Sequence, residues 1–188
     1  MGKLSFKHNV ALVGFRGAGK SSVSEVLSEK IHLKCIHLDG YIERGLGYSI
    51  EELVSKNGWN SFRTIEEKYL NEVSNYNEIL LDSGGGVIEG ENEQFSERKY
   101  ELLKKNFIVI YLYLEKDTLL SRLNKITQSA HRPPLSDSLE KAYDRREPWY
   151  RKIADFTVDT GGKSPLVIAE IITENLKNRF PDYCAMEK

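Results

Sequence analysis

The residues with the clearest chemical potential lie in a glycine-rich segment near the N-terminus, Gly14-Phe-Arg-Gly-Ala-Gly-Lys20-Ser21-Ser22. Its spacing fits the pattern G-x-x-x-x-G-K-[ST], with an apolar run before it and a helical pattern after it. Glycines let the backbone curl until consecutive N–H groups point at one anion, and the positive end of the following helix adds to the attraction. The segment therefore predicts a phosphate-binding loop rather than an ordinary glycine-rich turn.

This phosphate loop, residues 14–22, contains side chains suited to binding a nucleoside triphosphate. The Lys20 ammonium can reach the β- and γ-phosphates, and the Ser21 hydroxyl can bind Mg²⁺. The predicted nucleotide-binding residues of the loop are Gly14, Gly17, Ala18, Gly19, Lys20, Ser21 and Ser22.

Two acidic residues follow apolar runs and are candidates for chemistry at the phosphates. Asp39 closes the sequence His37-Leu38-Asp39, where strand alternation puts His37 and Asp39 on one face. Asp39 can help to hold Mg²⁺, it can orient and deprotonate an attacking hydroxyl group, or it can cap a helix that begins at Gly40. Asp82 follows the third apolar run, where a magnesium-binding acid is expected. Position alone leaves the readings of Asp39 open.

Glycines and arginines complete the set of candidate residues. Residues 84–86 are three glycines that either bring backbone N–H groups close to a small ligand or form a flexible connection. Arginine neutralises charge on a transferred phosphoryl group and binds carboxylates through two parallel hydrogen bonds. A single arginine is more often a solvated surface residue, so the prediction depends on the set of Arg63, Arg132, Arg145 and Arg146.

Five short apolar runs, separated by helical patterns, must position these residues. The run 107–114 is rich in β-branched and aromatic residues and does not alternate, which is typical of a parallel strand covered on both faces. The pattern predicts a three-layer α/β fold with a five-stranded parallel sheet, and ligands in such folds bind beyond the carboxyl ends of the strands. The expected strands are 9–13, 35–38, 78–81, 107–114 and 156–158, and the expected helices include 21–30, 60–76 and 164–178.

Two segments fall outside this pattern. Residues 127–137 carry two prolines and small polar side chains between helical patterns. They form either a lid that closes over a ligand or an ordinary connection. Residues 179–188 show little periodicity and are expected to be peripheral or frayed.

Composition narrows the class of protein. The chain has 188 residues and a formal net charge of −1, which predicts a single domain over residues 1–188 and disfavours a protein that coats nucleic acid or a membrane surface. Two cysteines cannot form a disulfide framework, so we expect a cytoplasmic location. The N-terminal residues lack the apolar core of a signal peptide, and the longest apolar run is too short to span a bilayer. The four histidines lack the spacing of a zinc site.

The motifs, taken in order, resemble those of the shikimate kinase family, which has the P-loop fold of nucleoside monophosphate kinases. The resemblance runs from about residue 10 to residue 172. Only the phosphate loop is specific by itself, but six pieces at compatible spacing are specific together. They are the phosphate loop, Asp39-Gly-Tyr-Ile-Glu, Gly58-Trp-Asn-Ser-Phe-Arg63-Thr-Ile-Glu66, Gly84-Gly-Gly-Val87, Arg132-Pro with Leu135, and Arg146-Glu-Pro-Trp-Tyr150.

The resemblance implies that ATP phosphorylates the 3-hydroxyl group of shikimate, with Mg²⁺ as cofactor, giving shikimate 3-phosphate and ADP. It implies substrate-binding helices within residues 40–76. Asp39 would hold substrate hydroxyl groups and assist the attacking one, while Arg63 and Arg146 would bind the substrate carboxylate. The predicted substrate-binding residues are Asp39, Arg63, Gly84, Gly85, Gly86 and Arg146.

Further roles follow from the same resemblance. Arg132 would move with the lid and, together with Lys20, stabilise the transferred phosphoryl group. Arg122 would lie near the adenine. The expected partners are ATP and shikimate alone, without nucleic acid or membrane, and the expected state is a monomer.

The sequence departs from the family pattern beside the metal and in the lid. The family usually has Asp-x-Asp after the second strand, and the first acid, which helps to hold magnesium through water, is His37 here. A neutral imidazole is a poor partner for hydrated Mg²⁺, so we expect Asp82 to replace the missing carboxylate. Pro134 stands where the lid pattern has leucine, a change that stiffens the lid. Two other functions stay open: a related kinase for another polyol or carboxylate, and a non-catalytic nucleotide-binding module.

Overall fold

A five-stranded parallel sheet forms the centre of the computed structural model, which describes residues 4–126, 135 and 137–186. Its strands are β2 (Val10–Val13), β3 (Lys34–His37), β4 (Ile79–Asp82), β5 (Ile108–Tyr113) and β6 (Phe156–Asp159). They lie in the order β3-β4-β2-β5-β6, and all neighbouring pairs are parallel. The predicted sheet is confirmed.

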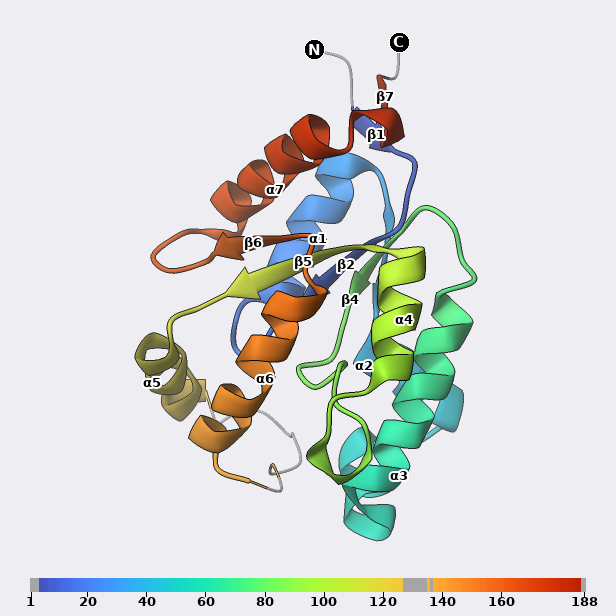
Figure 1. Cartoon of the computed structure of the whole chain (residues 1–188), viewed down its shortest axis with the longest axis vertical. Coiled ribbons are helices and arrows are strands. Elements are labelled where there is room, and N and C mark those ends of the chain that lie inside the picture. Colours follow the sequence, from blue (N-terminus) through green and yellow to red (C-terminus); the bar gives the residue numbers. More distant parts are fainter. Residues whose placement is uncertain (1–3, 127–134, 136, 187–188) are drawn as a thin grey trace.

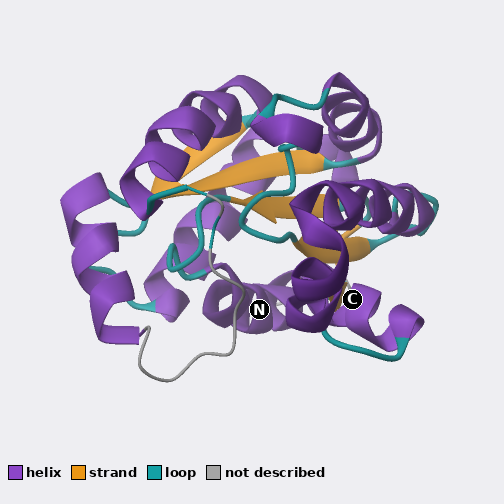
Figure 2. Ribbon diagram, turned by 90° about the horizontal axis from the view of Figure 1, so that it is seen from below, coloured by secondary structure: helices purple, strands orange, loops and turns teal. Residues whose placement is uncertain are grey.

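Helices cover both faces of this sheet and give the molecule three layers (Figures 1 and 2). On one face, α1 (Lys20–Ile31) packs along α7 (Pro165–Arg179). On the other face, α4 (Glu97–Asn106) and α6 (Leu139–Ile153) pack against β5, and α5 (Lys116–Ile126) packs against α6. The three-layer α/β fold expected from the sequence is confirmed.

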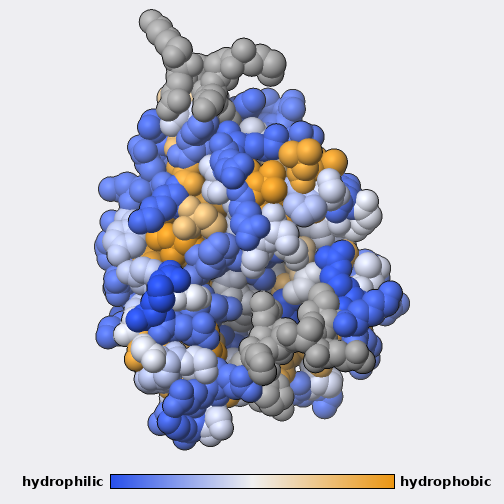
Figure 3. Space-filling model, turned by 180° about the vertical axis from the view of Figure 1, so that it is seen from behind, coloured by the Kyte–Doolittle hydropathy of each residue, from blue (hydrophilic) through white to orange (hydrophobic). Residues whose placement is uncertain are grey.

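The core lies between the sheet and its two helical layers. All four residues of β2 and all four of β4 are buried. Strands covered on both faces need apolar residues at successive positions, which explains why the apolar runs of the sequence do not alternate. The surface in Figure 3 is mostly hydrophilic, with apolar side chains gathered in small patches. Among the described helices, none combines the length and the apolar character that crossing a membrane requires.

The helix after β3 begins earlier than the sequence pattern predicts. This helix, α2 (Leu38–Leu46), starts directly after His37, because Leu38 and Ile42 bury one of its faces. Asp39 therefore lies in the first turn of a helix, neither at the end of a strand nor at a capping position. The expectations that the strand extends to residue 38 and that the helix begins at Gly40 are wrong.

The next helix, α3 (Ile50–Val73), also begins earlier, at Ile50 rather than at residue 60. Ser49 caps it, because its hydroxyl accepts a hydrogen bond from the Glu52 N–H at 3.1 Å. The backbone of Gly58 leaves helical geometry, with φ of 78° and ψ of 171°. This kink breaks the apolar periodicity, so the sequence pattern indicated only the second part of the helix.

The two termini meet in a small antiparallel sheet that the sequence did not predict. In it, β1 (Leu4–Phe6) pairs with β7 (Cys184–Met186), and the 3₁₀ turn η2 (Pro181–Tyr183) precedes β7. The rings of His8 and Tyr183 stack with centroids 4.4 Å apart. Of the two alternatives for residues 179–188, peripheral or frayed, the frayed one is wrong as far as Met186, because strand pairing and ring stacking hold this segment.

Candidate active site

The phosphate loop connects β2 to α1, and its curve depends on glycine. Gly14, Gly17 and Gly19 have φ values of 145°, 84° and 96°, at which an L side chain is strained. A Cβ on Gly14 would lie 2.6 Å from the backbone oxygen of Leu112, so that position also lacks room. The three glycines therefore determine the shape of the loop.

The first turn of α1 faces this loop. Its N-cap is Gly19, and no side chain of the described residues caps the N–H groups of the turn, which leaves them available to an anion. The Lys20 ammonium donates hydrogen bonds to the carbonyl oxygens of Gly14 at 2.8 Å and Phe15 at 3.2 Å. The lysine thus lies against the loop that it is predicted to serve.

Other predicted nucleotide-binding residues lie around the same loop. Ala18 is buried within it, and Ser21 and Ser22 are exposed at the start of α1. Arg122 of α5 donates from Nη1 to the Gly17 carbonyl oxygen at 2.9 Å. The fold therefore brings Arg122 to the loop from a helix about 100 residues away in the chain.

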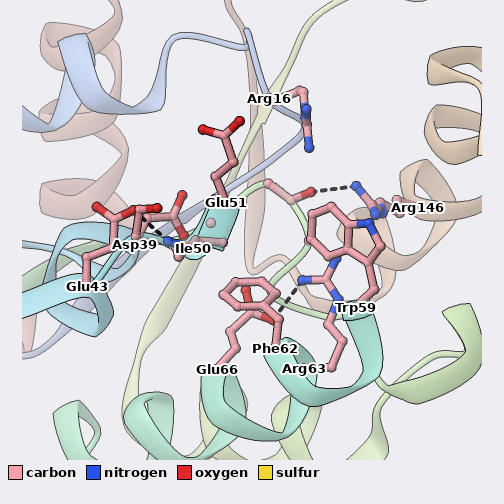
Figure 4. A pocket seen from close by; sticks show the side chains of 14 residues that line it. Arg16, Asp39, Glu43, Ile50, Glu51, Trp59, Phe62, Arg63, Glu66 and Arg146 are labelled. Carbon is pink, nitrogen blue, oxygen red and sulfur yellow. Dashed lines mark hydrogen bonds and ion pairs between the residues drawn. The ribbon is translucent and has the colours of Figure 1, made fainter. Parts of the chain in front are cut away.

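A pocket of about 430 Å³ opens beside the loop at the carboxyl end of the sheet (Figure 4). We call it the central pocket. Its walls come from the phosphate loop, α2, α3, the turn after β4, and α6. All six residues predicted to bind substrate line it: Asp39, Arg63, Gly84, Gly85, Gly86 and Arg146.

Opposite walls of the central pocket carry opposite charge (Figure 4). Carboxylates from α2 and the start of α3 face guanidinium groups from α3 and α6. A ligand with hydroxyl groups at one end and a carboxylate at the other fits this polarity. The acidic wall is Asp39, Glu43 and Glu51, and the basic wall is Arg63 and Arg146, with Arg16 at the edge. The Glu66 carboxylate also lines the pocket, on the basic side, where it pairs with Arg63.

The sequence prediction did not name every residue of this pocket. Glu51 and Trp59 lie within the substrate-binding helices predicted over residues 40–76, but neither was predicted to bind substrate. Trp59 packs over Arg63, with Cζ of the arginine 5.1 Å from the ring centroid. The apolar spacing of Ile50 and Leu53 after Ser49 was the available signal for the earlier start of α3.

The three consecutive glycines after β4 leave room for the charged side chains of the pocket. Their φ values lie outside the left-handed region, so space rather than conformational freedom requires glycine here. The alternative of a merely flexible connection is therefore not supported. A Cβ would lie 2.6 Å from Asp39 Oδ1 at Gly84, 2.8 Å from the Arg16 backbone nitrogen at Gly85, and against the guanidinium of Arg63 at Gly86.

The two arginines of the basic wall are buried, and a carboxylate that the sequence prediction missed bridges them. Arg63 is 5 % exposed and Arg146 is 2 % exposed. Glu89 accepts hydrogen bonds from Arg63 Nη2 at 2.7 Å and from Arg146 Nε at 3.1 Å. Arg145 donates to the same carboxylate from Nη2 at 3.0 Å. Apart from the position of Glu89 shortly after the glycines, nothing in the sequence indicates its role, because Arg63 and Arg146 are 26 and 57 residues away in the chain.

A second buried carboxylate, Glu66, lies one turn after Arg63 on α3. It accepts hydrogen bonds from Arg63 Nη1 at 2.9 Å and from Lys99 Nζ at 2.7 Å. Burial raises the pKa of Glu66, but the charges of Lys99 and Arg63 more than offset this effect, so its pKa lies below the ordinary value. The three-residue spacing of Arg63 and Glu66 was a readable sign of this pair.

The pKa of Glu89 is lowered for similar reasons. Burial raises this pKa. The hydrogen bond and charge of Arg146, together with the charge of Arg63, lower it by more, so the pKa lies below the ordinary value. Both carboxylates are therefore ionised near neutral pH.

Asp82 and His37 end neighbouring parallel strands and contact each other. The strand register places them side by side, with His37 Nδ1 2.8 Å from Asp82 Oδ2. The Asp82 side chain is 7 % exposed, whereas that of His37 is 44 % exposed. Leu12 lies opposite Asp82 on β2, the strand that leads into the phosphate loop. The two positions that depart from the family pattern thus form one pair beside the loop.

Part of the predicted machinery lies outside the described residues. This holds for Arg132, for Pro134 and for most of the expected lid at 127–137. Of that segment, Asp137 accepts a hydrogen bond from Arg145 Nη1 at 2.9 Å. The roles predicted for Arg132 and the lid stay predictions.

Comparisons with known proteins identify the family that uses this arrangement. The family model for shikimate kinase matches residues 16–177. This chain belongs to the shikimate kinase family. It is 34 % identical over 172 residues to the shikimate kinase of Dehalococcoides mccartyi, covering 91 % of this chain and 94 % of that protein. It is 35 % identical over 174 residues to the shikimate kinase of Leptospira biflexa, covering 88 % and 94 %.

A solved structure of a family member agrees with this assignment. The shikimate kinase from Acinetobacter baumannii, in complex with shikimate, superposes with a TM-score of 0.81 at 31 % identity, covering 92 % of this chain and 94 % of that chain. Shikimate kinases are ATP-dependent phosphotransferases that act on a hydroxyl group, and this chain is such a kinase. Neither a kinase for another acceptor nor a non-catalytic module is favoured.

Proposed function

We propose that the chain transfers the γ-phosphoryl group of ATP to the 3-hydroxyl group of shikimate where the phosphate loop meets the central pocket. The observation that carries this proposal is the opposite charge of the two pocket walls beside the loop. Shikimate presents a carboxylate on one side of its ring and hydroxyl groups on the other. Arg63 and Arg146 bind the carboxylate, and the acidic wall receives the hydroxyl groups.

On the nucleotide side, backbone N–H groups of the phosphate loop and the Lys20 ammonium bind the β- and γ-phosphates. Ser21 and Ser22 lie at the same helix start, and Arg122, held at Gly17, flanks the adenine. Arg132 approaches with the lid at 127–137 and stabilises charge on the transferred phosphoryl group. Closure of the lid excludes water from the reaction.

On the acceptor side, Asp39 accepts a hydrogen bond from the 3-hydroxyl group and takes its proton as the new bond forms. The hydroxyl oxygen forms a bond to the γ-phosphorus while the bond from that phosphorus to the β–γ bridging oxygen breaks. The electron pair of that bond leaves with ADP. The glycines at 84–86 keep the backbone close to the substrate ring and leave Asp39 and Arg63 room to reach it.

The donor set beside the loop fits a magnesium ion. Mg²⁺ prefers hard oxygen ligands, and the Asp82 carboxylate and the exposed Ser21 hydroxyl are of this kind. The 2.8 Å contact with His37 orients the Asp82 carboxylate beside the loop. Asp82 thereby supplies the carboxylate that replaces the acid of the family at the position of His37. When bound with ATP, Mg²⁺ neutralises charge on the phosphate oxygens.

The proposal includes the wider setting of the reaction. The chain acts as one domain over residues 1–188, with α2 and α3 as its substrate-binding helices. It works as a monomer in the cytoplasm on ATP and shikimate, without nucleic acid or membrane. The near-neutral charge and the two free cysteines support this setting. A single species of about 21.6 kDa in light scattering is the expected result, and a stable dimer would contradict it.

Steady-state release of ADP, with and without shikimate, tests the proposed reaction. Turnover stimulated by shikimate is expected. Turnover only with other acceptors, or binding of ATP without turnover on any acceptor, would contradict the proposal.

Arg63→Ala tests the carboxylate contact. Loss of charge-assisted hydrogen bonds should raise the KM for shikimate roughly 100-fold and leave the KM for ATP little changed. Arg98→Ala is the matched control, because Arg98 lies on the surface of α4 and is 75 % exposed. An unchanged KM for shikimate would remove Arg63 from the site, provided that thermal unfolding shows the variant to be folded.

A further inference from the structure

Glu89 lies behind the basic wall of the central pocket and contacts the arginines of that wall. Its Oε2 accepts from Nη2 of Arg63 at 2.7 Å and also from Nη2 of Arg146, and its Oε1 accepts from Nε of Arg146 at 3.1 Å. The residue is 2 % exposed. Among the described residues, both arginines line the pocket and Glu89 does not. Glu89 can therefore influence a bound substrate by setting the positions of Arg63 and Arg146.

The hydrogen bonds to Glu89 and its neighbours determine which arginine N–H groups face the substrate. Arg146 gives Nε and one N–H of Nη2 to Glu89, and Nη1 donates to the Gly85 carbonyl oxygen at 3.3 Å. Arg63 gives Nη2 to Glu89 and Nη1 to Glu66. Guanidinium groups held in this way keep N–H groups in fixed directions for a second carboxylate.

The charges of the buried cluster are incomplete by one anion. Its cations are Arg63, Arg146 and Lys99, and its anions are Glu66 and Glu89, so one positive charge is in excess. Arg145, which is more exposed, has further carboxylates of its own, Asp137 at 2.9 Å and Glu93 at 3.2 Å. Counted with Arg145, Asp137 and Glu93 the whole network is neutral, so the excess positive charge is confined to the buried members, and a substrate carboxylate would pair with it.

The backbone around Glu89 is also fixed. Lys99 Nζ donates to its carbonyl oxygen at 2.8 Å. In the following 3₁₀ turn, η1 (Glu91–Glu93), Asn92 and Glu93 have positive φ values of 52° and 59°. Asn60 of α3 holds this turn, because it exchanges two hydrogen bonds with Asn92, at 2.8 and 3.0 Å. Strain of this kind persists only where the surroundings determine the conformation.

We propose that Glu89 is a positioning residue for substrate binding, which holds Arg63 and Arg146 on one shared carboxylate and makes the pocket selective for an acceptor that carries one carboxylate. The proposal rests on the proposed function, in which these arginines bind the carboxylate of shikimate. Glu89 does not contact the substrate, so its effect must depend on whether the ligand has a carboxylate at all.

The test compares Glu89→Gln with the unchanged chain on two ligands, shikimate and its uncharged methyl ester, by calorimetric Kd. The variant should bind shikimate roughly tenfold or more weakly, because the loss of the shared acceptor that positions both arginines outweighs the attraction of the added positive charge, whereas its Kd for the ester should change less than about threefold. The preference for the acid over the ester therefore falls about tenfold. The kcat with shikimate should change much less than its KM.

Two further variants make the result specific. Glu89→Asp keeps the charge on a shorter side chain, so its preference for the acid should lie between those of the unchanged chain and Glu89→Gln. Glu93→Gln is the matched control. Glu93 lies in the turn η1 that follows Glu89 and pairs with Arg145 at 3.2 Å, so its substitution should leave the preference unchanged.

Several outcomes would overturn the inference while the proposed function stands. They are an equal loss of affinity for acid and ester, an unchanged preference in Glu89→Gln, or the same loss of preference in Glu93→Gln. If Glu89→Gln shows no cooperative thermal unfolding, Glu89→Asp decides, and an unchanged preference in that variant overturns the inference. Failure of the unchanged chain to phosphorylate shikimate would instead overturn the proposed function.

Discussion

The phosphate loop draws its binding groups from consecutive residues, 14–22, whereas the central pocket draws them from segments spread between residues 16 and 146. The loop binds mainly with backbone N–H groups, whose directions are fixed by glycines with positive φ. The pocket binds with side-chain charges, whose directions are fixed by other buried charges. A site made of backbone is thus specified locally, and a site made of charges is specified by the tertiary fold.

This difference has an energetic side. Removing charged groups from water is costly, and breaking a buried pair leaves an uncompensated charge, at a cost of about 3–5 kcal/mol. Each of the buried anions Glu66 and Glu89 therefore has two or more cationic partners. The pocket half of the site depends on many residues at once, whereas the loop half depends on its own backbone.

Lys20→Ala should have the largest effect and should affect only the loop half. The ammonium lies against the loop that is predicted to bind the phosphates, so we expect kcat to fall roughly 1,000-fold. The Kd for shikimate, measured without nucleotide, should stay within about twofold of its normal value. Lys30→Ala, in the last turn of the same helix, is the control. A comparable loss of shikimate affinity in Lys20→Ala would show that the two halves are not independent.

The contrast explains what the sequence could predict. The phosphate-loop motif and the five strands were readable from local patterns, whereas the six predicted substrate-binding residues, which line the pocket, came from the resemblance to the family. The partners of Arg63 were not readable except for Glu66, which lies on the same helix. Glu89 is 26 residues from Arg63 and 57 from Arg146, and sequence periodicity carries no information over such separations.

The errors at element boundaries have local causes. Strand alternation predicts that Asp39 lies at the end of a strand on the same face as His37, whereas burial of Leu38 and Ile42 starts a helix at once. The pairing of β1 with β7 was not predicted, because each strand has only three residues and its partner lies at the other end of the chain.

Asp82→Ala tests how the two halves are joined at the metal. If Asp82 holds Mg²⁺, the Mg²⁺ concentration for half-maximal activity should rise about 100-fold in this variant. His37→Ala removes only a contact that orients Asp82, so its rise should stay below about tenfold. Activity measured against total Mg²⁺ at saturating ATP and shikimate provides the comparison. The reverse ranking of the two variants would contradict the assignment of Asp82.

Substitution of single glycines in the run 84–86 should disturb the pocket half selectively. In Gly86→Ala the new Cβ would meet the guanidinium of Arg63, so the KM for shikimate should rise about tenfold. In Gly84→Ala the Cβ would lie 2.6 Å from Asp39 Oδ1, so kcat should fall about tenfold instead.

The control for these two variants is Gly40→Ala, where the nearest atom to a new Cβ is the end of the Arg44 side chain at 3.4 Å. Its kinetic constants should stay within about twofold. Steady-state kinetics with both substrates separates the outcomes. A larger change in the KM for ATP than in the KM for shikimate in Gly86→Ala would mean that the glycine run serves the nucleotide.

Acid should destabilise the molecule through the pocket half. The folded pKa values of Glu66 and Glu89 lie below the ordinary value of 4.5, so the unfolded chain takes up protons first as the pH falls. The stability that these carboxylates provide is complete above that value and is lost as the pH falls through their lower folded pKa values. The free energy of unfolding, measured with urea between pH 7 and pH 3, should therefore fall as the pH falls. Glu66→Gln should reduce the slope of this free energy against pH by up to about 1.4 kcal/mol per pH unit. Glu170→Gln, on the surface of α7, should keep the normal slope, and an identical slope in Glu66→Gln would place the acid sensitivity elsewhere in the molecule.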